Sequence, residues 1–121
     1  MTPSANAAKI LLWILKIVAA IAFLTAGASK LIGFPATVEM FTLIGLGQGF
    51  RYVTGTLEIA CALLLFAPAF TYYAATLLAA IMIAAIAIER TVLGGSLFPP
   101  ATLLLVLVVI AFLSRARVRR R

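Results

Sequence analysis

The chain has 121 residues, of which 65% are apolar and only 11% are charged, and its mean hydropathy is +1.23. A soluble domain of this length does not have such a composition, so the sequence predicts an integral membrane protein. The net charge of +7 does not indicate nucleic-acid binding, because the cations are concentrated at the C-terminal end instead of being spread over a folded surface.

Four apolar stretches are candidates for membrane spans. The hydrocarbon core of a bilayer is about 30 Å thick, so a crossing helix needs about 20 residues at a rise of about 1.5 Å each. The predicted spans are residues 10–28, 52–70, 72–89 and 98–113. The fold class that follows is all-α integral membrane: a four-transmembrane-helix bundle with a short interfacial helix between spans 1 and 2. We expect it to form a single membrane domain over residues 1–121.

The first stretch, residues 10–28, also has features of a secretory signal peptide, because Lys9 precedes it and small residues end it. Its length of about 19 residues exceeds the roughly 7 to 15 of a typical signal core, so a first span is the favoured interpretation. Lys16, inside this stretch, is expected to extend its ammonium group toward the nearer membrane surface.

The connection between the first two spans, residues 31–51, is too long for a simple turn and too apolar for a free linker. Pro35 stands where a helix would begin, and Gly45 opens a run of glycines typical of a helix end. Between them, apolar residues recur every three positions. The sequence therefore predicts an interfacial helix over residues 35–47, either sealing one end of the bundle or forming a lid over a ligand pocket.

Glu58 is one of only three acidic residues and lies within the apolar second span. A carboxylate at such a position needs a partner or a water-filled cavity. Arg51, Gly55 and Glu58 are separated by four and three residues, so they share one helix face. On the first span, Gly27 and Lys30 offer a matching surface. An interhelical Lys30–Glu58 ion pair is the arrangement that we predict.

Two interpretations of this polar cluster remain open. The ion pair either clamps the first two spans together, or it lines a pocket that binds a lipid headgroup, a quinone carbonyl or another small molecule, or relays protons. The candidate ligand-binding residues are Lys30, Glu58, Arg51 and Glu89. Glu89 ends the third span and equally suits an interfacial anchor. The candidate structural residues are Gly27, Gly55, Pro35 and Gly45.

The residue inventory argues against a complete catalytic site in this chain. It contains no histidine and no aspartate, which excludes bis-histidine haem ligation and a histidine general base. A single cysteine, Cys61, forms neither an internal disulfide nor a dithiol motif. We therefore expect no catalytic residues, no metal site, no intrinsic cofactor and no stand-alone enzyme activity.

The C-terminal segment, residues 114–121, carries five arginines directly after the fourth predicted span. Under the positive-inside rule this segment faces the cytoplasm, and four spans place the N-terminus on the same side. We expect a multi-pass protein of the cell (inner or plasma) membrane with both termini cytoplasmic. The arginines also suit contact with anionic lipid headgroups, and nucleic acid is not an expected partner.

Three motifs follow one another along the chain: Gly-x-x-Lys-Leu at residues 27–31, an aromatic segment ending in Gly-Leu at 41–46, and Gly-x-x-Glu at 55–58. Together they resemble the DoxX-like (DoxX/MauE-type) family of small four-helix membrane proteins, and the resemblance covers nearly the whole chain. The positions that match the family pattern most specifically are Gly27, Lys30, Gly55 and Glu58.

The resemblance implies a link to membrane redox complexes, because the family is named for a subunit associated with thiosulfate:quinone oxidoreductase. An accessory or scaffold subunit of a quinone-linked membrane complex is the favoured interpretation. The alternatives are a binder of a small molecule, lipid or quinone at Lys30 and Glu58, and a small proton-coupled transporter. The expected partners are the lipid bilayer and either another membrane protein or a second copy of the chain.

Overall fold

The computed structural model describes residues 3–94 and 98–119, and regular secondary structure in these ranges is helical throughout, as the sequence predicts. The elements are α1 (Pro3–Ile32), α2 (Pro35–Ile44), α3 (Gln48–Leu64), α4 (Thr71–Ile88), the π-helical turn η1 (Glu89–Leu93) and α5 (Phe98–Arg119).

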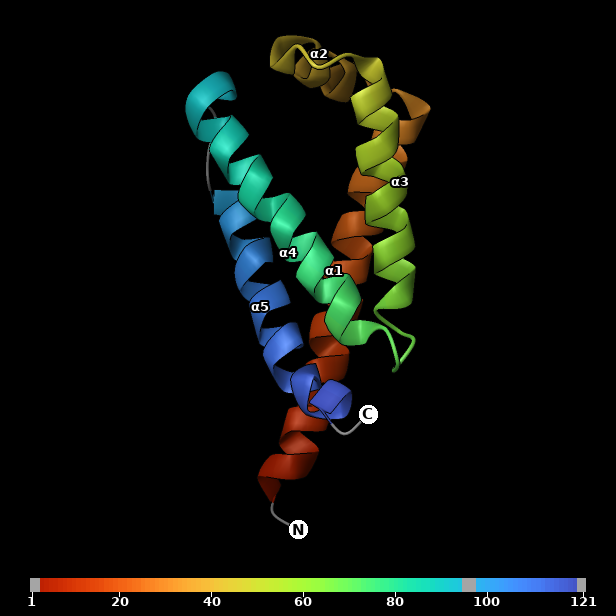
Figure 1. The fold of residues 1–121 in the computed structure, drawn as a ribbon, viewed down its shortest axis with the longest axis vertical. Helices are drawn as coiled ribbons and strands as arrows, with labels where there is room; N and C mark the ends of the chain where they lie inside the picture. The colour runs from red at the N-terminus through yellow and green to blue at the C-terminus, as the bar shows by residue number, and fades with distance from the viewer. Residues whose placement is uncertain (1–2, 95–97, 120–121) are drawn as a thin grey trace.

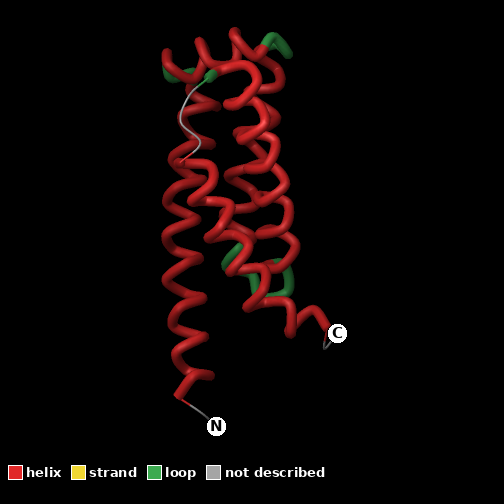
Figure 2. The backbone as a smooth tube through the Cα atoms, turned by 90° about the vertical axis from the view of Figure 1, so that its left-hand side faces the viewer, coloured by secondary structure: helices red, strands yellow, loops and turns green. Residues whose placement is uncertain are grey.

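The long helices form two antiparallel pairs. Helix α1 packs along α3, and α4 packs along α5, with smaller contacts between α1 and α5 and between α3 and α4. Figure 1 shows the pairs diverging toward one end, where α2 lies across the bundle, and Figure 2 shows the same arrangement from the side. The largest fully buried apolar side chains lie where the two pairs meet: Phe23, Leu65, Leu78, Leu107 and Ile110.

Two helical segments are long and apolar enough to cross a membrane, Asn6–Ile32 and Thr71–Thr91. They correspond to the first and third predicted spans. Within the described residues the fourth span contributes a shorter apolar helix, Pro100–Arg115. Helix α3 has 17 residues, which at about 1.5 Å per residue is about 26 Å, less than the roughly 30 Å hydrocarbon core. Of the four predicted spans, therefore, the first and the third are helices long enough to cross a membrane.

Helix α3 differs most from its predicted bounds, since it occupies Gln48–Leu64 and not residues 52–70. Its last turn tightens: the Phe66 and Ala67 N–H groups each bond to the carbonyl three residues earlier. Pro68 then disfavours a helical conformation at the residue before it and has no N–H of its own. The chain consequently turns before the predicted end of the span, and the turn leads directly into α4.

Helices α1 and α5 extend beyond their predicted spans into the more polar ends of the chain. Backbone hydrogen bonding satisfies a helix in water as well as in lipid, so hydropathy alone does not locate its ends. The Arg115 guanidinium lies over the Phe112 ring at 4.3 Å from its centroid. The side chains of the predicted arginine-rich segment beyond Arg115, and Arg120 and Arg121 entirely, lie outside the described residues.

The position of α2 is set by the way α1 ends. Gly33 adopts a left-handed conformation at φ 75°, and the Phe34 N–H donates to the Ser29 carbonyl at 3.0 Å, which closes α1 in a Schellman motif. Pro35 is the first residue of α2, and Gly45, at φ 82°, ends it. The short connection turns α2 across the end of the bundle, above the space between α3 and α4 (Figure 1).

Candidate functional site

The site begins with a close approach of α1 and α3. A Cβ atom on Gly27 would lie 2.8 Å from the Gly55 carbonyl oxygen, and one on Gly55 would lie 3.0 Å from the Gly27 oxygen. A Cβ atom at either distance would crowd the backbone of the facing helix, so both positions favour glycine, which has no side chain. Small residues at helix crossings allow this packing in membranes. The close crossing brings Lys30, three residues after Gly27 on α1, into contact with Glu58, three residues after Gly55 on α3.

Lys30 is held by three residues from one face of α3. Its Nζ atom donates to Glu58 Oε1 at 2.7 Å, its carbonyl oxygen accepts a hydrogen bond from Arg51 Nη1, and its Cβ packs on Gly55. The Glu58 side chain is only 2% exposed and that of Lys30 is 15% exposed. The structure thus forms the ion pair predicted from the sequence, and the spacing of four and three residues explains why α3 presents all three contacts together.

Arg51 acts at a different place from the ion pair. Its Nε donates to Gln48 at 2.7 Å, and its guanidinium reaches the last turn of α1 and lies over the Tyr52 ring. A cation at the C-terminal end of a helix satisfies a free carbonyl and opposes the negative end of the helix dipole. Arg51 therefore joins α1 to α3, and it does not line the cavity described next.

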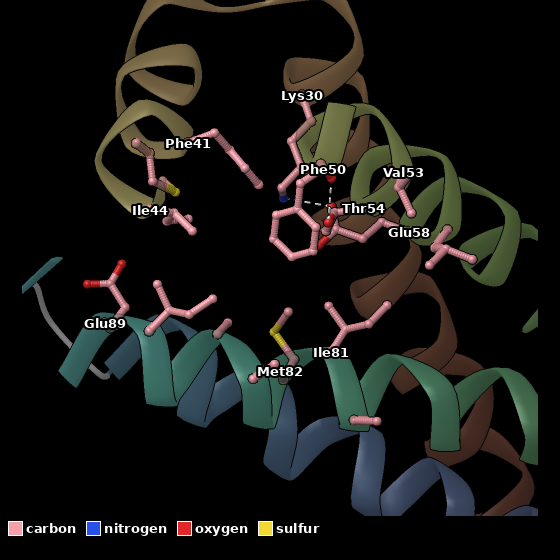
Figure 3. A pocket seen from close by; sticks show the side chains of 16 residues that line it. Lys30, Phe41, Ile44, Phe50, Val53, Thr54, Glu58, Ile81, Met82 and Glu89 are labelled. Atoms are coloured by element: carbon pink, nitrogen blue, oxygen red, sulfur yellow. Dashed lines mark hydrogen bonds and ion pairs between the residues drawn. The ribbon is translucent and has the colours of Figure 1, made fainter. Parts of the chain in front are cut away.

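A cavity of about 360 Å³ lies between α3 and α4, beneath α2. It is shown in Figure 3. Its walls are mainly apolar, and its lining includes Lys30, Phe41, Phe50, Glu58, Ala84 and Glu89. Cavities that hold small molecules have this character: predominantly apolar walls with a few polar groups that fix the orientation of the ligand.

The polar groups of the cavity lie on two opposite walls. Lys30 and Glu58 contribute their ion pair from the α1 and α3 side, whereas Glu89 projects from the α4 side (Figure 3). Thr54 also lines the cavity, and its hydroxyl donates to the Phe50 carbonyl at 2.9 Å. Of the four predicted ligand-binding residues, the structure brings Lys30, Glu58 and Glu89 to one cavity, while Arg51 lies at the adjoining helix end.

Glu89 opens the π-helical turn η1, which the sequence analysis did not anticipate. The Gly94 N–H donates to the Glu89 carbonyl at 2.6 Å, and Gly94 is left-handed at φ 69°. The wider turn ends α4 directly beside α2. Such π-turns occur frequently at functional sites. The sequence signal for this π-helical turn is a pair of glycines, Gly94 and Gly95, after an apolar stretch. An ordinary helix end has the same signal.

Sequence reasoning also missed the aromatic part of the cavity. Phe41 from α2 and Phe50 from α3 both line it, with ring centroids 5.7 Å apart. The regular spacing in α2 placed Phe41 on an apolar face, but spacing alone does not tell which element that face covers. Met82 is buried in the core and contributes to the cavity wall as well. Among the described residues no group of three potential metal ligands occurs.

The described residues thus form a helical bundle with two apolar helices of membrane-spanning length, a buried interhelical ion pair and an apolar cavity. The DoxX-like family matches residues 14–114, which include all the long helices in large part and the motifs at Gly27–Lys30 and Gly55–Glu58. The chain belongs to the DoxX-like family, and it is accordingly a membrane protein. Among curated proteins and among solved structures, no match to the chain is found.

Proposed function

We propose that this protein binds a small, largely apolar molecule with one polar group, of the quinone or lipid class, in the cavity between α3 and α4. The observation that carries the proposal is a cavity of about 360 Å³ with a buried ion pair on one wall and a carboxylate on the other. Its volume falls within the range of roughly 300 to 1,000 Å³ typical of small-molecule sites.

The ion pair can take part in binding without breaking. An ammonium group has three N–H donors, and the described contacts of Lys30 Nζ use one of them, toward Glu58. A carbonyl or hydroxyl oxygen of the ligand would accept from another. The buried Glu58 keeps its partner throughout, so ligand binding does not require an unpaired charge in an apolar setting.

The membrane topology that we propose places this cavity in the outer half of the bilayer. The start of α1 and the end of α5 lie at the end of the bundle opposite α2 (Figure 1). The positive-inside rule assigns the arginine-rich end to the cytoplasm, which leaves α2 at the outer surface. A molecule dissolved in the outer leaflet would then reach the cavity from the lipid.

An accessory subunit of a membrane complex is the second candidate. The observation that favours it is an exposed apolar face on α1, on which the side chains of Ile10, Ile14, Ile17 and Ile21 are each 48% exposed or more. Such a face suits a helix of another membrane protein as well as lipid. Nothing within the described residues specifically favours proton-coupled transport.

Two alanine variants on one helix test the binding function. Ala84 lines the cavity, whereas Ala87 is also exposed on α4 but does not line it. Native mass spectrometry of gently extracted protein should show a retained small molecule in the wild type and in Ala87→Phe, and its loss in Ala84→Phe. Equal retention by Ala84→Phe, or a wild type that carries only a partner protein, would overturn the binding proposal; the latter result would favour the accessory role.

A further inference from the structure

We infer that the ligand of this cavity carries a positive charge: an amphipathic cation, with an apolar body between α3 and α4 and a cationic group at Glu89. The inference rests on the proposed binding function and narrows the class of ligand. It follows from the charges that line the cavity and from the absence, among the described residues, of a protein partner for one of them.

The charged side chains of the lining are one lysine and two glutamates, Lys30, Glu58 and Glu89. The lysine and Glu58 neutralise each other at 2.7 Å, so the lining has a net formal charge of −1. Glu89 lies on the wall opposite that pair (Figure 3). A cationic group at Glu89 would therefore be held away from the Lys30 ammonium and would balance the charge of the cavity.

Among the described residues no side chain forms a hydrogen bond or ion pair with the Glu89 carboxylate. Its neighbour Arg90 is exposed and does not line the cavity, and the guanidinium of Arg51 is engaged at the end of α1. A partly buried carboxylate without a partner is costly beside apolar surface. A cationic ligand would supply the missing partner, whereas a neutral quinone would leave the carboxylate uncompensated.

Two aromatic rings line the cavity on the side of Lys30 and Glu58, opposite Glu89 (Figure 3). Phe41 and Phe50 both line the cavity, and their centroids lie 5.7 Å apart at an interplanar angle of 56°. The rings therefore suit the apolar body of the ligand, whereas the Glu89 carboxylate favours a lipophilic amine over an alcohol and disfavours an anionic headgroup.

The net charge of the whole chain would favour an anionic ligand over a cationic one. Its net charge of +7 attracts anions through its long-range field, and this attraction is screened within about 8 Å at physiological salt. A preference for a cation is therefore a signature of the cavity itself. The exposed Glu39 of α2, which does not line the cavity, allows a matched loss of one negative charge elsewhere.

The test compares three probes with the same alkyl chain: decylamine, decanol and decanoate. Equilibrium dialysis against phosphatidylcholine nanodiscs measures binding in excess of empty nanodiscs, for the wild type and for Glu89→Gln, Glu89→Asp, Glu39→Gln and Ala84→Phe. We expect the wild type, Glu89→Asp and Glu39→Gln to bind decylamine about tenfold more tightly than decanol, with decanoate weakest. Glu89→Gln should lose the preference for the amine and still bind decanol.

The outcomes separate the two proposals. If Glu89→Gln keeps the amine preference, or if the wild type binds decanol or decanoate as tightly as decylamine, the cationic ligand is wrong and the binding function stands. If none of the probes binds in excess of empty nanodiscs, or if Ala84→Phe binds them as the wild type does, the binding function fails and this inference fails with it.

Discussion

The ion pair between α1 and α3 makes a quantitative prediction about stability. Replacing Lys30 with methionine keeps an apolar stem against Gly55 but leaves the Glu58 carboxylate, 2% exposed, without its partner. Removing one member of a buried pair costs about 3 to 5 kcal/mol, because the other charge stays buried and unpaired. We therefore expect Lys30→Met to lower the free energy of unfolding by about 3 to 5 kcal/mol.

The reciprocal change, Glu58→Met, should cost less. The Lys30 side chain is already 15% exposed, and a long flexible stem lets an ammonium group move toward water or headgroups. We expect a loss of about 1 to 3 kcal/mol. The double variant, with methionine at both positions, removes both charges and fills the same space. It should unfold within about 1 kcal/mol of the wild type.

The assay is equilibrium unfolding in mixed micelles with increasing dodecyl sulfate, followed by the loss of helical circular dichroism. A double-mutant cycle over the four proteins gives the coupling between the two side chains. Two results would contradict this prediction: a smaller loss of stability for Lys30→Met than for Glu58→Met, or a double variant whose loss equals the sum of the two single losses. Either result would mean that the carboxylate is not buried against the lysine as described.

Further predictions concern the helix contacts around this pair and use the same unfolding assay. Gly55→Val should lower the free energy of unfolding by several kcal/mol, because a Cβ at this position would lie 2.9 Å from the Lys30 Cβ. The control Gly49→Ala, whose Cβ would have no atom within 4 Å, should be neutral or slightly stabilising. Equal effects of the two substitutions would argue against a close crossing of α1 and α3. Arg51→Met should lower the free energy of unfolding by about 1 to 3 kcal/mol, because the Lys30 carbonyl at the end of α1 would lose its hydrogen-bond donor. An unchanged unfolding midpoint would contradict the role of Arg51 in joining α1 to α3. Gly45→Ala should cost about 1 to 2 kcal/mol, since its φ is 82°; a stabilised variant would count against the left-handed helix end.

The sequence predicted the contacts that depend on helical spacing. Arg51, Gly55 and Glu58 recur at intervals that place them on one face of any α-helix, and a carboxylate in an apolar stretch requires a partner. Among the three other predicted spans, the first has a lysine, Lys30, just beyond its end, and this lysine offered that partner. The Lys30–Glu58 pair follows from these constraints, because both the periodicity and the cost of an unpaired charge act locally.

The cavity could not be predicted in the same way. It exists because the α1–α3 and α4–α5 pairs diverge and because α2 turns across the opening (Figure 1). These are properties of packing between elements that are distant in sequence. Apolar residues that face lipid, a core or an empty cavity look alike in a membrane sequence, so the roles of Phe41, Phe50 and Ala84 carried no distinguishing signal.

The bounds of α3 illustrate a further limit. Hydropathy extended the second span to residue 70, since the residues around Pro68 are apolar. The proline nevertheless ends the helix through its effect on the backbone, which a hydropathy average does not register. At the other end, Arg51 lies just before the predicted span of residues 52–70, although it belongs to the first turn of α3, where it reaches the end of α1.

The most direct test of cavity binding is to map where a ligand sits. Photoreactive diazirine analogues of decylamine and decanol would be bound in nanodiscs, irradiated, and located by peptide mass spectrometry with and without excess unlabelled probe. We predict that the competed labelling falls on lining residues of α3 and α4, such as Leu57 and Ala84. Labelling confined to the exposed face of α1, around Ile14 and Ile17, and unaffected by competitor would contradict the claim that the cavity binds a small molecule.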